Sequence, residues 1–379
     1  MILALESVSN FAENLSESHA GRESRFDQRF PKVMNMKILV VGDGHSAIHE
    51  VAVVEALRKL GHQVKPFYWQ SYFNSQNPVG RLWQRVQNKF LIGPTLRKIN
   101  TDLVDAAGQF NPKLIFIYRG THIFPKTIAK IKEKLPQCVV YGYNNDDPFA
   151  AGHPPWLWRH FMKCLPIYDL VFSYRKHNIA EYINRDAKKV ELLMPWYVPE
   201  TDYPIAQGEL IEKKYDVVFV GHYENDGRIE YLEKISQSKY TFGLFGPDWS
   251  RAPDYDWLQC KQPVLPVRGD FYRETLISAK IALCFLSTLN RDTYTRRCFE
   301  IPAMGVFMLC QYSDDLAQIF NDGVDVVFFR NSEEMLEKID YYIKNDRLRE
   351  QIAANGRERV VYDKHDISSR IKYVLSHVG

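Results

Sequence analysis

Residues 113–143, KLIFIYRGTHIFPKTIAKIKEKLPQCVVYGY, contain two short apolar runs separated by a longer segment of helical period. Both runs are rich in β-branched and aromatic residues, which favour buried strands. A strand, a helix and a second strand in this order are typical of a β-α-β unit, in which the two strands lie parallel. The stretch therefore predicts a doubly wound α/β fold.

The same alternation begins at Lys37 and occurs in two series. The first series predicts strands at residues 37–42, 63–69, 113–118, 138–143, 169–174 and 189–194, and the second at 215–221, 241–246, 280–286, 306–310 and 325–329. After the last strand, Asn331 is a predicted helix cap that Glu334 would complete as a capping box. Residues 195–214, PWYVPETDYPIAQGELIEKK, contain three prolines and no steady period, which indicates a linker. We expect two doubly wound domains that face a cleft at the carboxyl ends of their strands.

Composition limits the class of protein. The 379 residues suffice for two cores, and 45% hydrophobic with 25% charged residues is typical of a globular chain. The net charge of +3 argues against a nucleic-acid partner. No apolar run reaches the roughly 18 residues that a membrane span needs. Residues 1–36 fit no targeting peptide, and we expect them to be a flexible extension.

The cysteines are far apart and form no C-x-x-C motif, so we interpret them as reduced core residues of a cytoplasmic protein. They are Cys138, Cys164, Cys260, Cys284, Cys298 and Cys310.

The loop after the first predicted strand resembles a dinucleotide fingerprint, because Gly42, Gly44 and Ala47 follow the G-x-G-x-x-A pattern. The second strand ends without the carboxylate that would hold a ribose, so a tight turn is favoured over NAD binding. His45 and His49 lack a third ligand, and no metal site is predicted from them. The two glycines remain places where the backbone can approach an anion or a sugar closely.

Four polar residues follow the fourth predicted strand, at its carboxyl end. Asn144, Asn145, Asp146 and Asp147 would point into the cleft, where two acids can bind a metal or accept a proton from a hydroxyl nucleophile. An Asp before Pro148 is equally typical of a helix start, with its side chain capping free amides. Both interpretations remain open.

Two helix starts in the second half suit an anion or a base. Arg228 follows the strand that Gly221 closes, and an arginine at a helix start fits phosphate oxygens. Gly269 and Tyr272 lie at another helix start, where an aromatic ring could stack on a base. A solvated arginine and a packed tyrosine are the simpler alternatives.

The segment at residues 291–305, RDTYTRRCFEIPAMG, lies between two predicted strands on the cleft side. Glu300 would be costly to bury unpaired, so we expect its partner to be a ligand diol or the pair Arg296 and Arg297. A ribose diol would donate two charge-assisted hydrogen bonds to this carboxylate.

From Asp292 to about Asp366 the chain resembles the nucleotide-binding domain of group 1, family 4-like GT-B glycosyltransferases. The branch it resembles most is that of the spore maturation protein CgeB. The family's E-x7-E motif is matched by Asp292-x7-Glu300, with the first acid one methylene shorter. Arg297 and Gly305 match its R-x-F-E arginine and the glycine that follows, and residues 146–148 resemble its D-D-P.

The resemblance implies a GT-B fold with two Rossmann-like domains. Residues 37–200 would form the acceptor domain, residues 201–363 the donor domain, and residues 364–379 a helix that crosses back to the first domain. It places Asp292 near the transferred sugar and Glu300 on the ribose, and makes Asp146 and Asp147 catalytic or acceptor-side residues. The acceptor would enter near Gly42 to His45, Arg119 to His122 and Asn144 to Asp147. Arg297 and Arg228 would stabilise the leaving diphosphate, because members of the family generally use no metal or other cofactor.

The leading hypothesis is an enzyme that transfers a sugar from a nucleotide-diphosphate donor to an acceptor, which would be a saccharide, a lipid-linked molecule or a protein. A nucleotide-sugar binding protein without turnover and an NAD-dependent enzyme are the alternatives. Residues 81–98, RLWQRVQNKFLIGPTLRK, predict either a packed helix or a basic, aromatic helix that rests on the inner face of a membrane.

Overall fold

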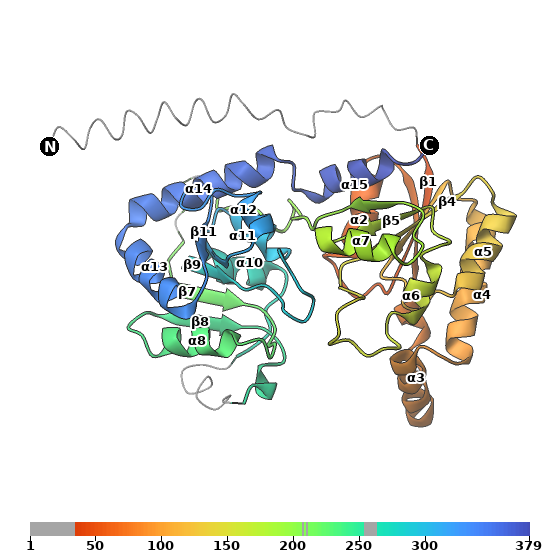
Figure 1. The fold of residues 1–379 in the computed structure, drawn as a ribbon, viewed down its shortest axis with the longest axis horizontal. Helices are drawn as coiled ribbons and strands as arrows, with labels where there is room; N and C mark the ends of the chain where they lie inside the picture. Colours follow the sequence, from red (N-terminus) through yellow and green to blue (C-terminus); the bar gives the residue numbers. More distant parts are fainter. Residues whose placement is uncertain (1–34, 207, 210, 254–263) are drawn as a thin grey trace. The chain divides into compact units, whose positions relative to one another are not determined.

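The computed structural model describes residues 35–206, 208–209, 211–253 and 264–379. Most of the predicted extension at residues 1–36, and Cys260, lie outside these ranges. The strands form two parallel sheets, one from each half of the chain (Figure 1). All eleven predicted strands are present, with ends that differ by at most two residues, so the predicted α/β fold with two Rossmann-like sheets is confirmed.

The first sheet has the strand order β2-β1-β3-β4-β5-β6. Its strands are β1 (Lys37–Gly42), β2 (Gln63–Tyr68), β3 (Leu114–Tyr118), β4 (Val139–Asn144), β5 (Leu170–Ser173) and β6 (Val190–Leu192). The segments between them are α2 (Glu50–Lys59), η1 (Trp69–Tyr72), α3 (Pro78–Phe90), α4 (Pro94–Phe110), α5 (Pro125–Lys134), α6 (Arg159–Cys164) and α7 (Lys176–Ile183).

Helices cover both faces of this sheet, which explains why its strands are apolar at nearly every position. Side chains alternate along a strand, so Ile38 and Val40 pack on the α2 side, whereas Leu39 and Val41 pack on the α4 and α5 side.

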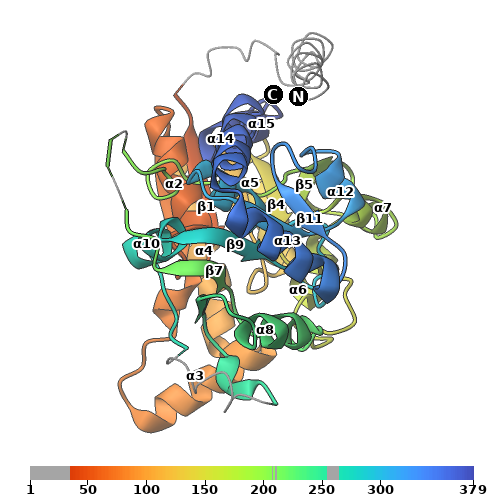
Figure 2. The ribbon, with the colours of Figure 1, turned by 90° about the vertical axis from the view of Figure 1, so that its left-hand side faces the viewer.

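The second sheet has the order β11-β10-β9-β7-β8. Its strands are β7 (Tyr215–Val220), β8 (Phe242–Phe245), β9 (Ala279–Cys284), β10 (Met308–Gln311) and β11 (Val327–Phe329). Its helices are α8 (Arg228–Ser236), η2 (Trp249–Arg251), α10 (Asp270–Ile277), α11 (Arg297–Ala303), α12 (Asp314–Ala317), α13 (Ser332–Lys344) and α14 (Asp346–Tyr362). α8 and α13 lie side by side on one face (Figures 1 and 2).

The predicted cap of α13 is present. The Asn331 side chain accepts a hydrogen bond from the Glu334 N–H (2.8 Å), and the Glu334 carboxylate accepts one from the Arg330 N–H (2.7 Å), one residue before the cap. The two hydrogen bonds satisfy amides that the helix itself leaves free.

The chain ends on the first sheet. α15 (Ile367–Leu375) packs beside α2 (Figure 1). The Ile367 N–H donates to the Tyr197 carbonyl (3.0 Å), and the Tyr141 hydroxyl donates to the His377 carbonyl (2.5 Å). The predicted return of the last helix is therefore confirmed.

None of the helices in the described ranges has the length and apolar composition that a bilayer crossing requires. The five described cysteines are all buried, as predicted for core residues.

Candidate functional site

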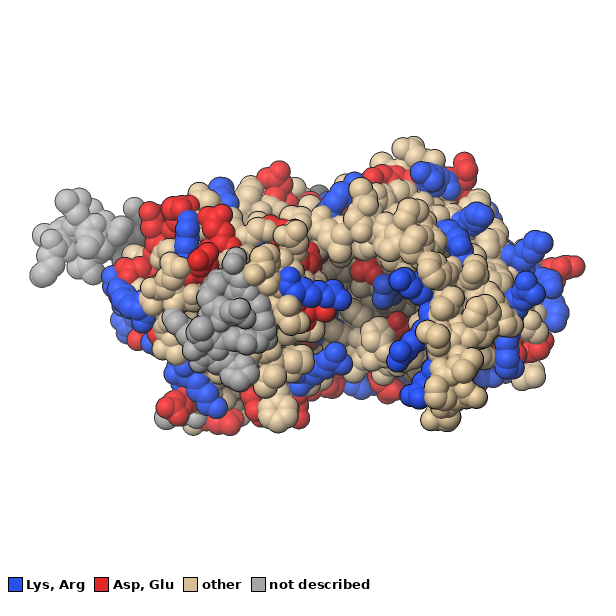
Figure 3. Space-filling view, turned by 90° about the horizontal axis from the view of Figure 1, so that it is seen from below, with Lys and Arg blue, Asp and Glu red and all other residues tan. Residues whose placement is uncertain are grey.

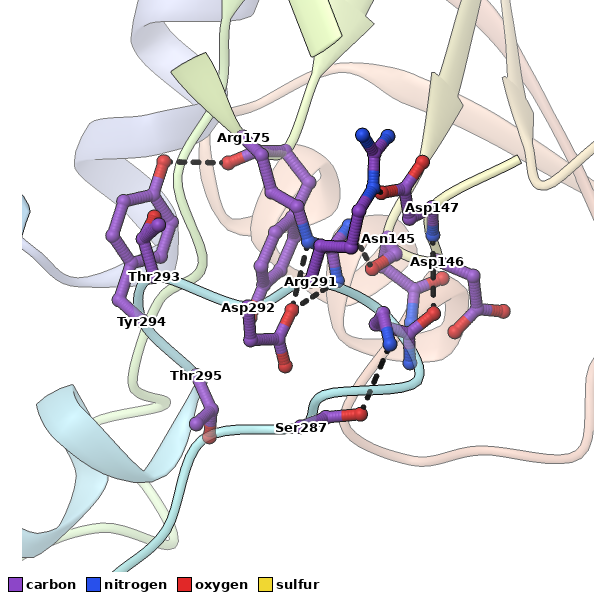
Figure 4. A network of polar contacts seen from close by, with 12 residues as sticks. Asn145, Asp146, Asp147, Arg175, Ser287, Arg291, Asp292, Thr293, Tyr294 and Thr295 are labelled. Carbon is purple, nitrogen blue, oxygen red and sulfur yellow. Dashed lines mark hydrogen bonds and ion pairs between the residues drawn. The ribbon is translucent and has the colours of Figure 1, made fainter. Parts of the chain in front are cut away.

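Loops from the carboxyl ends of both sheets meet in direct contact (Figure 4). Arg175, just after β5, donates through Nε to Asp292 of the loop that follows β9 (2.8 Å). From the same loop, Arg291 pairs with Asp147 after β4 (2.6 Å), and the Asn290 side chain accepts the Asp147 N–H (3.1 Å). Residues more than a hundred positions apart thus form one polar network.

A cavity of about 160 Å³ lies at this junction. Its lining consists of His49, Tyr118, Tyr143, Asn145, Asp146, Tyr174, Arg175, Pro195, Trp196, His222, Glu224, Ser287, Asn290, Asp292, Thr295, Arg296 and Arg297. These residues come from loops of both sheets and from the segment that connects the sheets, so the cavity lies where ligands bind in α/β folds.

Asp292, the first acid of the predicted motif, lines the cavity and is only 9% exposed in its side chain. Burial raises the pKa of its carboxyl to about 6, and the nearby Arg175 guanidinium opposes that rise. Arg175 also donates to the Asn145 carbonyl (3.1 Å). The carboxylate predicted to lie by the sugar is therefore held by a guanidinium from the other sheet.

Glu300, the second acid, is buried and is not part of the cavity lining. Its carboxylate pairs with Arg296 (2.5 Å) and accepts a hydrogen bond from the Tyr272 hydroxyl (3.0 Å). Arg296 also pairs with Asp202 (3.2 Å). Of the partners expected for Glu300, the structure supplies Arg296, and the ribose role stays a prediction.

Arg297 differs from the other two arginines of the lining. It begins α11 and lines the cavity, yet among the described residues no carboxylate lies within ion-pair distance of it. Its buried Nε has no hydrogen-bond partner in the described part of the chain, and the same holds for Oδ1 of Asn145. Buried polar groups without partners are rare, and in a cavity wall they mark places for ligand atoms.

Arg228, the other predicted diphosphate residue, is neutralised by its neighbours. Its side chain is 1% exposed, pairs with both oxygens of Asp226 and donates to the His222 carbonyl (2.8 Å). Glu224 in the cavity wall also contacts it (3.5 Å). Burial alone would raise the pKa of Glu224, but a hydrogen bond from His222 and the charge of Arg228 lower it to about 2.

The two adjacent acids after β4 have different surroundings. Asp146 lines the cavity and pairs with Arg119 (2.7 Å). Asp147 is completely buried beside it, pairs with Arg291, and caps the turn by accepting the Phe149 N–H (2.9 Å). No helix starts at Pro148, so Asp147 caps a turn and not the predicted helix, and the chemical role expected of Asp146 and Asp147 stays a prediction.

The glycines of the loop after β1 do not contribute to the cavity lining. Gly44 has φ +85°, and a Cβ there would lie 2.5 Å from the Tyr68 ring. A side chain on Gly42 would meet Glu50 at 2.8 Å, and Glu50 accepts the Gly44 N–H (2.6 Å). Burial, and then the neighbouring Asp43, raise the pKa of Glu50 to about 8. His45 pairs with Asp43 at the surface.

Other predicted residues have structural contacts. His122 stacks on Trp69 and bonds Asn88 of α3 (2.8 Å). Gly221 accepts a hydrogen bond from Trp249 (2.9 Å). Two predicted glycines, Gly269 (φ +56°) before α10 and Gly305 (φ +68°) after α11, have a conformation that side chains disfavour. Asn144 is buried and accepts the Asp146 N–H (3.1 Å).

Sequence reasoning missed Arg175, His49 and Glu224 in the cavity wall. His49 contacts the Tyr118 hydroxyl (3.0 Å), and burial, then the charge of Arg296, lower its pKa to about 3, so it is neutral at physiological pH. Arg175 follows β5 directly, and the rule that drew attention to residues 144–147 would have found it. His49 and Glu224 carry no comparable signal.

Among the described residues, two clusters have the ligand spacing of a metal site. One is Asp43, His45 and Glu50, and the other is the buried trio Cys284, Cys298 and Cys310. Neither contributes a residue to the cavity lining.

Comparisons with known proteins agree with this geometry. A family model described as "Glycosyl transferase-like" matches residues 228–376. No curated protein matches the chain.

Solved structures match almost the whole chain at low identity. HepE of Anabaena, solved with UDP and glucose, is 13% identical with a TM-score of 0.61, covering 90% of this chain and 98% of its own. Sucrose-phosphate synthase from Thermosynechococcus elongatus is 14% identical with a TM-score of 0.64, covering 90% and 97%. A glycosyltransferase from Rickettsia africae is 13% identical with a TM-score of 0.63, covering 91% and 98%. The fold is therefore that of the GT-B proteins, and the match to the glycosyl transferase-like model covers residues 228–376, less than half of the chain.

Proposed function

We propose that the chain transfers a sugar from a nucleotide-diphosphate donor, and that Arg297 binds the diphosphate in the cavity between the two sheets. The observation that carries the proposal is the guanidinium of Arg297 in the cavity wall, which has a buried Nε without a hydrogen-bond partner and no carboxylate at ion-pair distance among the described residues. A guanidinium suits phosphate oxygens because its N–H groups match them in pairs. In support, HepE of Anabaena was solved with UDP and with UDP-glucose.

The reaction needs stabilisation of the charge that grows on the diphosphate as the glycosidic bond breaks. Fixed donors that point to this charge lower the barrier without having to reorganise. Arg297, the first residue of α11, would supply such donors. We propose that its guanidinium stabilises the diphosphate without a bound metal.

The acceptor would approach from the first sheet. His49, Asn145 and Asp146 form that side of the lining, and Asn145 has a free buried oxygen there. The ion pairs that join the loops would keep water out of the cavity and so limit donor hydrolysis. The Arg297, Phe299 and Glu300 pattern, with residues 146–148, supports assignment to the branch related to CgeB.

The test is binding and turnover of nucleotide sugars by the full chain. Thermal shifts with UDP, GDP, ADP and their sugars should identify one stabilising nucleotide class. Arg297→Met should weaken its apparent affinity at least about tenfold, the loss expected for one charge-assisted contact. Arg330→Met, at an exposed arginine on the second sheet, is the matched control and should bind as the parent does.

Release of free nucleotide from the donor separates the enzyme from a binding protein of the same fold. Nucleotide binding without any release, in the presence of varied acceptors, would support the non-catalytic alternative. Equal affinity in the parent and Arg297→Met would remove the arginine from the site.

A further inference from the structure

α3 projects from the first half of the chain (Figure 1), and it exposes the side chains that a helix normally buries. Val79 is 76% exposed, Leu82 64% and Trp83 53%, and Phe90 at its end is 38% exposed. Gln87, a polar residue, is the buried residue of this helix. The packed helix predicted as one alternative for residues 81–98 is therefore not what α3 forms.

The apolar residues of α3 form one stripe, in which Val86 is half-buried and the other four are exposed. Positions 79, 82, 83, 86 and 90 follow the spacing of three, four and seven residues that puts side chains on one face of a helix. Arg81, Arg85 and Lys89 are spaced by four and lie along one edge of that stripe. The helix thus has an apolar face with a basic border.

The protein body holds α3 through polar contacts. Gln84 donates to the Tyr72 carbonyl (3.0 Å) and accepts from the Ser75 N–H (2.8 Å), and Gln87 accepts the Thr95 N–H (2.8 Å). Asn88 contacts His122 (2.8 Å). Gln87 lies beside Trp83 at the edge of the stripe, and Phe90 contacts the Trp156 ring, whereas Val79 and Leu82 stay exposed.

The basic border has no acidic residue near it in the sequence. Residues 81–98 contain five lysines and arginines and no aspartate or glutamate, and none of the printed ion pairs of the described residues involves Arg81, Arg85 or Lys89. Figure 3, which looks at the molecule from the side on which α3 projects, shows uncharged surface there with blue side chains beside it. This pattern fits a partner that has an anionic surface and an apolar interior.

We propose that the face of α3 formed by Val79, Leu82, Trp83, Val86 and Phe90 inserts into the surface of a membrane that contains anionic lipid. The stripe would enter the boundary between headgroups and acyl chains, while the basic border contacts the headgroups. A second copy fits less well, because two such faces would bring like charges together. The proposal does not rest on the proposed glycosyl transfer.

Vesicle sedimentation with the full chain tests it. The parent should sediment with phosphatidylcholine vesicles that contain about 30% phosphatidylglycerol, and not with pure phosphatidylcholine. Leu82→Asp should lower the partition coefficient at least about tenfold, since a charge replaces an inserted apolar group. Val361→Asp, at a half-exposed apolar residue of α14, is the control and should sediment as the parent does.

A second set of variants tests the basic border. The triple change R81Q, R85Q, K89Q should lower binding about a hundredfold, because each cation near an anionic surface contributes about fivefold. K126Q, K130Q, K134Q makes the same charge change on α5 and should have a much smaller effect.

Nucleotide thermal shifts should be unchanged in all these variants, so failure of this proposal is distinguishable from failure of the donor site. Equal sedimentation of Leu82→Asp and the parent, or of the two triple variants, would overturn it. So would a dimer in solution that Leu82→Asp dissociates, because the stripe would then bind a second copy.

Discussion

Two opposing effects act on the pKa of Asp292, and the pH dependence of the free energy of unfolding shows which effect is larger. Burial favours the protonated carboxyl, whereas Arg175 favours the carboxylate; with burial dominant, the pKa rises from 3.8 to about 6. At about pH 5 the Asp292 carboxyl would then be protonated in about nine-tenths of the folded chains and in less than a tenth of the unfolded chains. A raised folded pKa contributes stability at low pH that is lost as pH rises through 6.

The perturbation is Asp292→Asn, which keeps the shape of the side chain and removes its titration. From about pH 5 to about pH 7.5 the free energy of unfolding of the parent should fall by about 1.4 kcal/mol relative to the variant. The variant also leaves Arg175 without its counter-charge, but that cost is independent of pH in this range and cancels in the comparison. Urea unfolding followed by tryptophan fluorescence at four pH values measures the difference.

Asp340→Asn is the control for that series. Hydrogen bonds from Lys344, Tyr240 and Lys239 lower the pKa of Asp340, so its contribution to stability is already complete at about pH 5 and should not change up to pH 7.5. A flat difference for Asp292→Asn as well would mean that the charge of Arg175 offsets or outweighs burial, because a carboxyl whose pKa is not raised has completed its titration below about pH 5. That result would refute the reasoning.

Two further substitutions test contacts near the site. Arg291→Met removes a guanidinium from the completely buried Asp147. Because Arg291 is 42% exposed and Asp147 keeps other donors, we expect the free energy of unfolding in urea to fall by about 1–2 kcal/mol. No loss would mean that the other donors suffice. Gly44→Ala places a Cβ 2.5 Å from the Tyr68 ring at φ +85°, so the melting temperature should fall by several degrees. Gly61→Ala is also at positive φ but in open space, so it should lower the melting temperature less. Equal losses would contradict the steric argument.

The fold was predictable because its signal is local and repeated. The signal is already visible in the four residues Ile38, Leu39, Val40 and Val41, because a strand covered on both faces needs apolar side chains at every position. The last helix was placed through a resemblance, because no local feature of residues 367–375 says which sheet it meets.

The site was only partly predictable, because pairing between loops is a property of the folded chain. Arg228 and Arg297 both begin helices, and helix position alone did not separate them. Asp226, two residues before Arg228, was a usable sign of neutralisation, since a side chain so close can reach back to the guanidinium. No such local sign predicts that Arg175 reaches Asp292 across the junction of the sheets.

These pairings determine how the cavity can meet a charged ligand. Its lining contains three arginines and three carboxylic acids, so it is close to neutral before a diphosphate enters. Arg175 and Arg296 are bound to Asp292 and Glu300, and cannot turn to a ligand without leaving a buried carboxylate unpaired. Arg297 has no such cost. The contribution of this arginine to donor binding should therefore exceed that of its two neighbours, although all three line the same small volume.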